Sequence, residues 1–356
     1  MRVVRLAVIP GDGIGLEVVP PALRILEAAG RLHGGLRFEC STFDWNCARY
    51  LREGRMMPED GLRVLEDFDA IFLGAVGHPA VPDHVSLWGL LIPIRRTFEQ
   101  YVNLRPARLL RGVPCPLSGR APGEIDFVVV RENCEGEYSN IGGRIHEGTP
   151  HEVAAQVSYF SRMGISRVAR YACELARTRR RRLTVATKSN GIVHTMPFWD
   201  AVVREVAAEY PDVEVRFVHV DALAAQFVLR PDALDVVVGS NLFGDILTDL
   251  AAAICGSIGI APSANLDPSR RRPSLFEPVH GSAPDIAGRG IANPVGAIWT
   301  AQMLLDFVGA GDVAAALLGA VQDVLAAGIR TPDLGGRAST AEVAGAVLER
   351  FGGTGA

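Results

Sequence analysis

The sequence predicts an α/β fold with a largely parallel sheet, and three observations carry this prediction. Short runs of β-branched residues alternate with helical patterns along most of the chain. The chain has 356 residues and 48% hydrophobic content, enough to form a large core in two domains or in one large α/β unit. The chain beyond about residue 293 is mostly helix rich in Ala and Leu.

The elements follow one another in an alternating order. The first four are a strand, a helix, a strand and a helix, at residues 3–9, about 16–29, 70–73 and 87–100. The next are buried strands, each followed by a helix, at residues 127–130, 183–186, 213–220 and 236–238. Segments rich in glycine at 111–123 and 136–148 are predicted to be loops or excursions, and no internal repeat is present.

Charge and composition exclude several classes of function. The net charge is −4, so no overall field favours nucleic acid or a membrane, and the short arginine runs at 179–182 and 270–272 are predicted to be solvated. The apolar stretch at residues 6–9 is cut off by Pro10 too early for a signal peptide. No apolar run is long enough to span a bilayer. Six cysteines without zinc spacing are typical of reduced thiols, so we expect a cytoplasmic protein.

Glycines follow the first predicted strand in the pattern GxGxG, at residues 11–15. A dinucleotide fingerprint has the spacing GxGxxG, so this match to a Rossmann fold is weak. A glycine turn between a strand and a helix is the better interpretation. The Gly281-Ser282 pair is similarly ambiguous, since its backbone is able to approach a phosphate or to form an ordinary turn.

Asp245 and Asp249 lie four residues apart in a predicted helix and therefore share one face. Like charges at this spacing destabilise a helix, and a hard divalent cation such as Mg²⁺ relieves the repulsion. The alternative is a pair of solvated aspartates, which their apolar neighbours make less natural. The pattern alone leaves the two interpretations evenly matched.

Four basic residues are candidates for chemistry on carboxylates. Lys188 leaves an apolar strand, where partial desolvation lowers an amine pKa and creates a base, although a surface lysine is commoner there. The guanidinium groups of Arg95, Arg105 and Arg131 suit carboxylates, although each taken alone is more typical of a salt bridge.

Six segments in a fixed order make the chain similar to a known family. They are IPGDGIG, VNLRP, VVREN-EGEY, ATKSN, SNLFGDILTD and FEPVHGSAPDIAGRGIANP. Together they resemble the β-decarboxylating dehydrogenases, the family of isocitrate, isopropylmalate and tartrate/D-malate dehydrogenases. The tartrate/D-malate branch is the most similar, through VPDHVSLWG, RENCEGEYSNIGG and IGIAPSANLDPSRRRPSLFEPVHGSAPDI.

The resemblance implies a particular architecture. The expected fold has two α/β domains, is not a Rossmann fold, and holds its active site in the cleft between the domains. A large domain on the cofactor side comprises residues 1–100 and 259–356. A small domain, residues 101–258, carries the dimer interface with the metal and catalytic residues. The family pattern also implies a homodimer with shared sites, and an arm at residues 136–152 that interlocks the subunits.

The resemblance also assigns roles to individual residues. Lys188 is the base for the C2 hydroxyl, and Tyr138 is the acid that protonates the enol. Asp245 and Asp249 bind the metal, with Asp221 contributed by the partner subunit. Arg95, Arg105 and Arg131 bind the substrate carboxylates. The residues expected near the cofactor are Asn190, His280, Gly281, Ser282, Ala283, Asp285, Ile286 and Asn293.

The implied reaction is the NAD- and Mg²⁺- or Mn²⁺-dependent oxidative decarboxylation of a small 2-hydroxy diacid, with K⁺ as a further candidate cofactor. Asp285 favours NAD, since a carboxylate accepts hydrogen bonds from a ribose diol but repels a 2′-phosphate. D-malate, giving pyruvate and CO₂, is the expected substrate, and tartrate follows. Alternatives are 3-isopropylmalate dehydrogenase and a silent regulatory paralogue, although the latter requires a lost catalytic residue.

The helix that ends in Arg95 predicts the size of the substrate. Gly89 and Leu91 replace the polar residues that isocitrate dehydrogenases offer to a third carboxylate. Trp88 replaces a glutamate of isopropylmalate dehydrogenases, and its indole is predicted to fill the space that an isopropyl group needs. The alternative is that Trp88 points away into the core. The chain also departs from the family at Cys134, where threonine is usual.

Overall fold

The computed structural model describes residues 1–353, so residues 354–356, the end of the predicted large domain, lie outside the described residues. The chain is built around one ten-stranded sheet, which confirms the α/β class. The strand order is β2-β1-β3-β12-β11-β4-β5-β10-β8-β9, and a separate hairpin joins β6 to β7. The strands are β1 (Arg2–Gly11), β2 (Leu36–Thr42), β3 (Ala70–Ala75), β4 (Val102–Arg108), β5 (Asp126–Glu132), β6 (Gly142–Ile145), β7 (Val153–Gln156), β8 (Arg182–Thr187), β9 (Glu214–His219), β10 (Val236–Gly239), β11 (Pro262–Leu266) and β12 (Ser274–Pro278).

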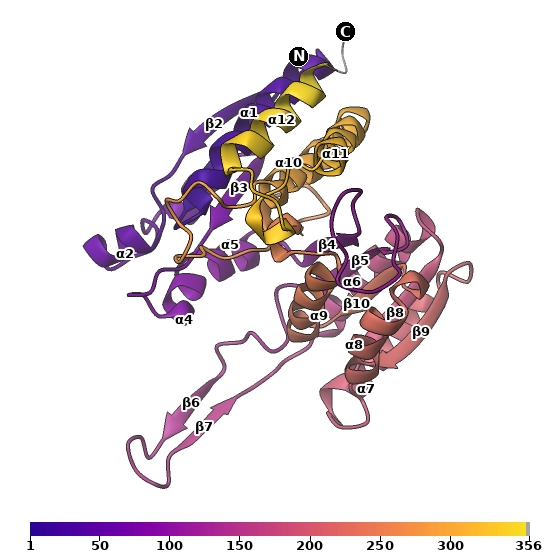
Figure 1. The fold of residues 1–356 in the computed structure, drawn as a ribbon. Helices are drawn as coiled ribbons and strands as arrows, with labels where there is room; N and C mark the ends of the chain where they lie inside the picture. The colour runs from indigo at the N-terminus through magenta and orange to yellow at the C-terminus, as the bar shows by residue number, and fades with distance from the viewer. Residues whose placement is uncertain (354–356) are drawn as a thin grey trace.

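The helices connect these strands and cover the sheet (Figure 1). Helices α1, α10, α11 and α12 pack on one another near β1–β3, and α6 packs on α7 near the β8 end of the sheet. The α-helices are α1 (Gly15–His33), α2 (Cys47–Glu53), α3 (Gly61–Leu65), α4 (Asp83–Ser86), α5 (Ile92–Thr97), α6 (Arg162–Arg177), α7 (Thr195–Ala207), α8 (Val220–Leu229), α9 (Asn241–Ile254), α10 (Val295–Phe307), α11 (Gly311–Ala326) and α12 (Thr340–Gly352). Shorter turns are η1 (Leu87–Leu91), η2 (Pro231–Ala233), η3 (Ile258–Ile260) and η4 (Pro332–Leu334).

The sheet is parallel at both ends and antiparallel in its centre. β1 pairs in parallel with β2 and β3, and β8 pairs in parallel with β9 and β10. Between them β12, β11, β4 and β5 pair antiparallel in succession. The predicted parallel character therefore holds for both ends, while β2 at one edge and β4, β11 and β12 in the centre were not expected from the sequence.

Alternating side chains of β1 and β3 belong to two different cores. Leu6 and Phe72 face the main core, which includes α1 and α10, whereas Ile9 and Leu73 face a smaller core. Strand side chains alternate between the two faces, so one strand is able to serve both cores. The smaller core also contains Leu90, Leu91, Ile94 and Phe98, and it therefore fixes the helical segment that carries Arg95.

The β6–β7 hairpin extends away from the rest of the chain (Figure 1). Every residue of both strands is exposed, including the apolar Ile145 and Val153. The hairpin lies in the segment 136–152 and just beyond it, where the sequence predicts an arm. In residues 1–353, no helix combines the length and hydrophobicity needed to cross a membrane.

Candidate active site

A cavity of about 210 Å³ lies where several elements meet around the carboxyl end of β3. The helical segment from α4 to α5 forms one wall, and β4, β5 and α9 form the opposite one. The sequence-predicted residues that line the cavity are Leu91, Arg95, Arg105, Arg131, Tyr138, Asp245, His280 and Gly281. Sequence reasoning missed further lining residues, among them Leu87, Arg96, Asn133, Asn241 and Glu277.

Three buried guanidinium groups converge on this cavity from three elements. Arg95 lies on α5, Arg105 on β4 and Arg131 on β5, and each side chain is almost fully buried. Antiparallel pairing of β4 with β5 brings Arg105 and Arg131 to neighbouring strands. Burial lowers the pKa of Arg131 to about 10 and also lowers the pKa of Arg105, although Asp245 opposes both shifts. Buried cations that are close together favour an anionic ligand.

Each arginine is oriented by a different neighbour. The Nη2 of Arg95 donates to Oε1 of Glu277 at 2.8 Å. The Nη1 of Arg105 donates to Oγ1 of Thr248 at 2.6 Å. The Nε and Nη2 of Arg131 both donate to Oδ1 of Asn241, at 3.0 and 2.6 Å. These contacts hold the guanidinium planes in place before any ligand binds, which lowers the entropic cost of binding a carboxylate.

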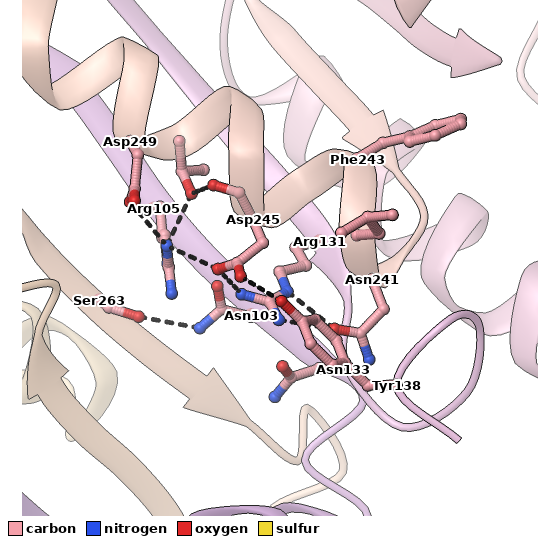
Figure 2. Close-up of polar contacts among 12 residues, drawn as sticks. Asn103, Arg105, Arg131, Asn133, Tyr138, Asn241, Phe243, Asp245, Asp249 and Ser263 are labelled. Carbon is pink, nitrogen blue, oxygen red and sulfur yellow. Dashed lines mark hydrogen bonds and ion pairs between the residues drawn. The ribbon is translucent and has the colours of Figure 1, made fainter. Parts of the chain in front are cut away.

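Tyr138 and Asp245 form a hydrogen-bonded pair at the centre of the site (Figure 2). The Tyr138 hydroxyl donates to Oδ2 of Asp245 at 2.6 Å, and Oδ1 of the same carboxylate pairs with Nη1 of Arg131. The Arg131 guanidinium also lies over the Tyr138 ring, 5.3 Å from its centroid. Burial and the neighbouring Asp245 raise the pKa of Tyr138 to about 12. The phenol is therefore protonated at neutral pH and is able to donate a proton.

The two aspartates of α9 present their carboxylates to the same arginine. Nη1 of Arg105 lies 3.5 Å from Oδ1 of Asp245 and 3.8 Å from Oδ1 of Asp249 (Figure 2). Burial raises the pKa of Asp249, and the charge of Asp245 adds to the shift. Burial acts in the same direction on Asp245, but Arg131 and Arg105 outweigh it and lower its pKa. The predicted helix spacing therefore does place both carboxylates on one face.

Asp221 and Lys188 lie together, but apart from this cavity. Nζ of Lys188, just beyond β8, is 2.9 Å from Oδ1 of Asp221 in the first turn of α8. Neither residue lines the cavity. Within residues 1–353, no group of three or more His, Cys, Asp or Glu side chains is placed to hold a metal ion. One chain thus brings Tyr138 to Asp245 but does not bring Lys188 to either of them.

The segment expected at the cofactor begins inside the cavity and continues outside it. His280 and Gly281 line the cavity, whereas Asp285 is exposed. The first glycine turn packs against this segment, because the amide of Ile14 donates to the Ser282 carbonyl at 2.9 Å. A Cβ on Gly13 would meet that carbonyl at 2.0 Å, which explains the glycine.

Two more residues expected near the cofactor lie outside the cavity. Asn190 is exposed in the loop after β8. Asn293 is buried, and its Nδ2 donates to Asp333 at 2.9 Å. The remaining expected residues, Ala283 and Ile286, are half-buried and do not line the cavity either.

Trp88 does not line the cavity, in contrast to the prediction that its indole fills it. The reason is a π-helical turn at Leu87–Leu91, in which the amide of Ile92 bonds to the carbonyl of Leu87, five residues earlier. This turn contains one residue more than an α-helical turn, so a side chain seven residues before Arg95 does not share its face as it would in an unbroken α-helix. Leu87 lines the cavity, and Trp88 lies beside Arg96, 5.0 Å from its guanidinium.

Comparison with known proteins gives consistent similarities over almost the whole chain. The family model described as isocitrate/isopropylmalate dehydrogenase matches residues 5–347. A probable tartrate dehydrogenase/decarboxylase of Bacillus subtilis is 54% identical over 352 residues, 99% of each chain. The decarboxylating D-malate dehydrogenase of Escherichia coli is 55% identical over 358 residues, covering 98% of this chain and 99% of its own.

Solved structures have the same fold. The isocitrate dehydrogenase of Methylococcus capsulatus superimposes with a TM-score of 0.87 at 34% identity, over 98% of this chain and 99% of that one. A β-decarboxylating dehydrogenase of Thermococcus kodakarensis in its apo form gives a TM-score of 0.77 at 38% identity, over 98% and 96% of the two chains.

Proposed function

This chain belongs to the isocitrate/isopropylmalate dehydrogenase family, and we propose that it oxidises and decarboxylates a small 2-hydroxy diacid with NAD and a divalent metal ion. D-malate, which gives pyruvate and CO₂, is the proposed best substrate and tartrate the next. The names of the two relatives, a tartrate dehydrogenase/decarboxylase and a decarboxylating D-malate dehydrogenase, support this choice of substrate.

The observation that carries the proposal is the cluster of Arg95, Arg105 and Arg131 around a small cavity. Three buried and already oriented guanidinium groups match the two carboxylates of a diacid, since each carboxylate accepts a pair of hydrogen bonds. Leu87 and Leu91 make part of the helical wall apolar, and these two side chains offer no hydrogen bond to a third carboxylate.

Tyr138 is the proposed acid for the step after oxidation. The C3–C4 bond of the oxidised intermediate breaks, CO₂ leaves, and the bonding electron pair remains on the substrate as an enolate. The phenol of Tyr138 donates its proton to C3, and water restores the phenol afterwards. A phenol is protonated at neutral pH, and burial and Asp245 raise the pKa of Tyr138 further, to about 12.

Asp245 and Asp249 fit half of a divalent metal site. Their carboxylates lie on one helix face beside the cavity and are partly exposed, and hard cations prefer such oxygen ligands. We propose that Asp221 of the partner completes the set in a homodimer. A bound Mg²⁺ or Mn²⁺ supplies Lewis-acid stabilisation of charge on the substrate oxygens.

The position of Lys188 supports the same assembly. As the proposed base for the C2 hydroxyl, it must lie near the substrate, yet in its own chain it pairs with Asp221 away from the cavity. A partner chain that places its own Lys188 and Asp221 in this cavity would bring the base to the substrate. The same proposal assigns 1–100 with 259–356 to the cofactor side, and 101–258 to the dimer interface.

NAD is the proposed cofactor, and it supplies the acceptor for the C2 hydride. Asp285 is exposed and follows the cavity-lining Gly281 by four residues, and its carboxylate is able to accept hydrogen bonds from a ribose diol. The Nε2 atom of His280 is buried without a hydrogen-bond partner among the described residues, so a polar group of a ligand is able to satisfy it.

A substrate screen tests the proposal. Purified protein with Mn²⁺ is assayed for reduction of NAD and of NADP with D-malate, L-tartrate, meso-tartrate, isopropylmalate and isocitrate. We expect the highest kcat/KM with D-malate and NAD, and no reduction after chelation of the metal. A higher kcat/KM with isopropylmalate or with NADP would reject this substrate or this cofactor. Reduction with none of the acids would favour the silent paralogue.

A further inference from the structure

Arg96 follows the substrate-binding Arg95 directly in the chain but makes a different contact. Its Nη2 donates to the backbone carbonyl of Tyr138 at 2.6 Å, across 42 residues of sequence. The side chain is half-buried and lines the cavity. A charged donor to a carbonyl makes a stronger hydrogen bond than a neutral donor. Arg96 therefore joins the helical wall of the cavity to the backbone of the residue that holds the phenol.

The segment that carries Tyr138 leaves the sheet at Glu132 and forms no regular element until β6. Its earlier part is held to α9, because Nδ2 of Asn241 donates to the Glu135 carbonyl at 3.0 Å. The Glu137 carboxylate accepts from the amide of Leu242 at 2.9 Å. At Tyr138 itself, the hydroxyl bonds to α9 through Asp245 and the carbonyl bonds to Arg96.

These two bonds act on opposite ends of Tyr138. One fixes the phenol oxygen, and the other fixes the backbone from which the ring projects. When a ligand or a metal ion competes for Asp245, the first bond is weakened. The contact with Arg96 then remains to hold the tyrosine in the cavity.

Trp88 supports Arg96 from the other side. The guanidinium carbon of Arg96 lies 5.0 Å from the centroid of the Trp88 ring, within the range of a cation–π contact. The π-helical turn that removes Trp88 from the cavity is the feature that brings its ring to Arg96. The two residues and the Tyr138 carbonyl thus form a row of contacts, which we call the Trp88–Arg96–Tyr138 contacts.

We propose that Arg96, held by Trp88, is a positioning residue that aims the Tyr138 phenol at the carbon to be protonated. This inference rests on the proposed role of Tyr138 as the acid. It gives Trp88 a part in the proton-transfer step and none in substrate size. Loss of the Trp88–Arg96–Tyr138 contacts slows protonation of the enolate, while binding of the diacid and hydride transfer continue.

The test separates the two chemical steps. Hydride transfer is measured as the NADH absorbance formed in a single turnover of D-malate. Decarboxylation followed by protonation is measured as pyruvate formed from added oxaloacetate with Mn²⁺, after subtraction of the rate without enzyme. The variants are Arg96→Met, Arg96→Lys, Trp88→Ala, Trp88→Phe and Tyr138→Phe. Arg204→Ala is the matched control, because Arg204 stacks on Phe217 at 3.9 Å outside the cavity.

For Arg96→Met we expect pyruvate formation to fall about tenfold, a part of what a positioned acid contributes, with KM and hydride transfer within about twofold of wild type. Arg96→Lys keeps a donor and should recover part of the rate. Trp88→Ala should lower the rate about threefold, and Trp88→Phe should lower it less because the ring is retained. Arg204→Ala should match wild type in both assays.

Four outcomes would overturn the inference. The first is that Arg96→Met forms pyruvate from oxaloacetate at the wild-type rate although Tyr138→Phe forms it slowly. The second is a large rise in the KM for D-malate with unchanged protonation, which would make Arg96 a substrate ligand. The third is an equal fall in both steps in both Arg96 variants, which indicates general damage to the fold. The fourth, an undiminished rate in Tyr138→Phe, rejects the acid assigned under the proposed function and the inference with it, whereas the first three leave that assignment standing.

Discussion

Asp245 has two functions in the described chain, because its carboxylate both accepts from Tyr138 and balances the charge of Arg131. Asp249 lies one turn later, is more exposed, and lies 3.8 Å from Arg105. The two aspartates are thus alike as proposed metal ligands but unlike as structural residues. This difference makes them a matched pair for separating metal binding from stability.

The first prediction concerns that pair. Asp245→Asn and Asp249→Asn should each lower kcat/KM by orders of magnitude and weaken Mn²⁺ binding in calorimetric titration, since each removes a charged oxygen ligand. Only Asp245→Asn should also lower the free energy of unfolding, because it leaves the buried Arg131 without its counter-ion. Full activity of either variant in metal-free buffer would contradict the metal assignment.

Glu132 supplies a prediction about pH. Burial raises its pKa to about 7, although the amides of Cys134 and Glu135 donate to the carboxylate and oppose the shift. The unfolded chain loses this proton near pH 4.5 and the folded chain near pH 7, so the folded state loses stability as the pH rises between the two values.

The measurement compares wild type with Glu132→Gln in urea unfolding at pH 5, 6, 7 and 8 and at one protein concentration. The stability of wild type relative to the variant should fall by about 1.4 kcal/mol per pH unit up to pH 7 and then level off. Only the slope of this stability difference against pH is used, so an effect of the glutamine on the free energy of unfolding that is the same at every pH does not alter the result. A difference independent of pH would show that Glu132 is ionised throughout this range.

Sequence reasoning identified the charged residues of the site better than the residues that orient them. Arg95, Arg105 and Arg131 were expected to act together, and all three line one cavity. Glu277 and Asn241 were not named as their partners, although they orient Arg95 and Arg131. Both partners are distant in sequence from the arginines they bind, and no local spacing indicates a contact that forms only after folding.

At the level of elements, the errors are concentrated in the centre of the sheet. The strands β11 and β4 carry polar residues inward, and Asn265 and Asn103 are fully buried. Nδ2 of Asn103 donates to Oδ1 of Asn265 at 2.9 Å, and Asn133 donates to the same oxygen. A pattern that identifies strands by runs of apolar residues cannot detect strands whose buried side chains include amides that bond to one another.

The π-helical turn at Leu87–Leu91 is another element that was not predicted from the sequence, and it changes the prediction about substrate size. Leu87→Ala should raise the kcat/KM for isopropylmalate relative to D-malate by about tenfold, since Leu87 lines the cavity and its truncation makes room. Trp88→Ala should leave this ratio unchanged. The opposite pattern, with a shift in Trp88→Ala alone, would restore the indole as the residue that excludes bulky acids.

At the scale of the whole molecule, the chain is incomplete as a catalyst under the proposed function. Tyr138 and Asp245 meet at the cavity, whereas Lys188 and Asp221 pair elsewhere. A homodimer with shared sites predicts that two variants defective at different steps complement each other in the conversion of D-malate to pyruvate. Mixed subunits of Lys188→Ala and Tyr138→Phe contain one site with both native residues.

The complementation is measured after the two variants are unfolded together and refolded at equal concentration. Random pairing should restore about a quarter of the wild-type rate of pyruvate formation from D-malate. Half of the dimers are hybrids, and each hybrid has one intact site of two. Each variant refolded alone is the control. No recovery, with hybrid dimers demonstrated by differently tagged subunits, would place Lys188 and Tyr138 in the same site of one chain.

The exposed β6–β7 hairpin has a consequence for the lifetime of the protein in the cell. A two-stranded ribbon has little stability of its own, and this one presents Ile145 and Val153 to water. A newly synthesised chain without a partner therefore offers proteases an accessible segment, whereas a proposed dimer that interlocks the two hairpins would hide it. Turnover of the enzyme would then depend on its own concentration, with surplus unpaired chains removed first.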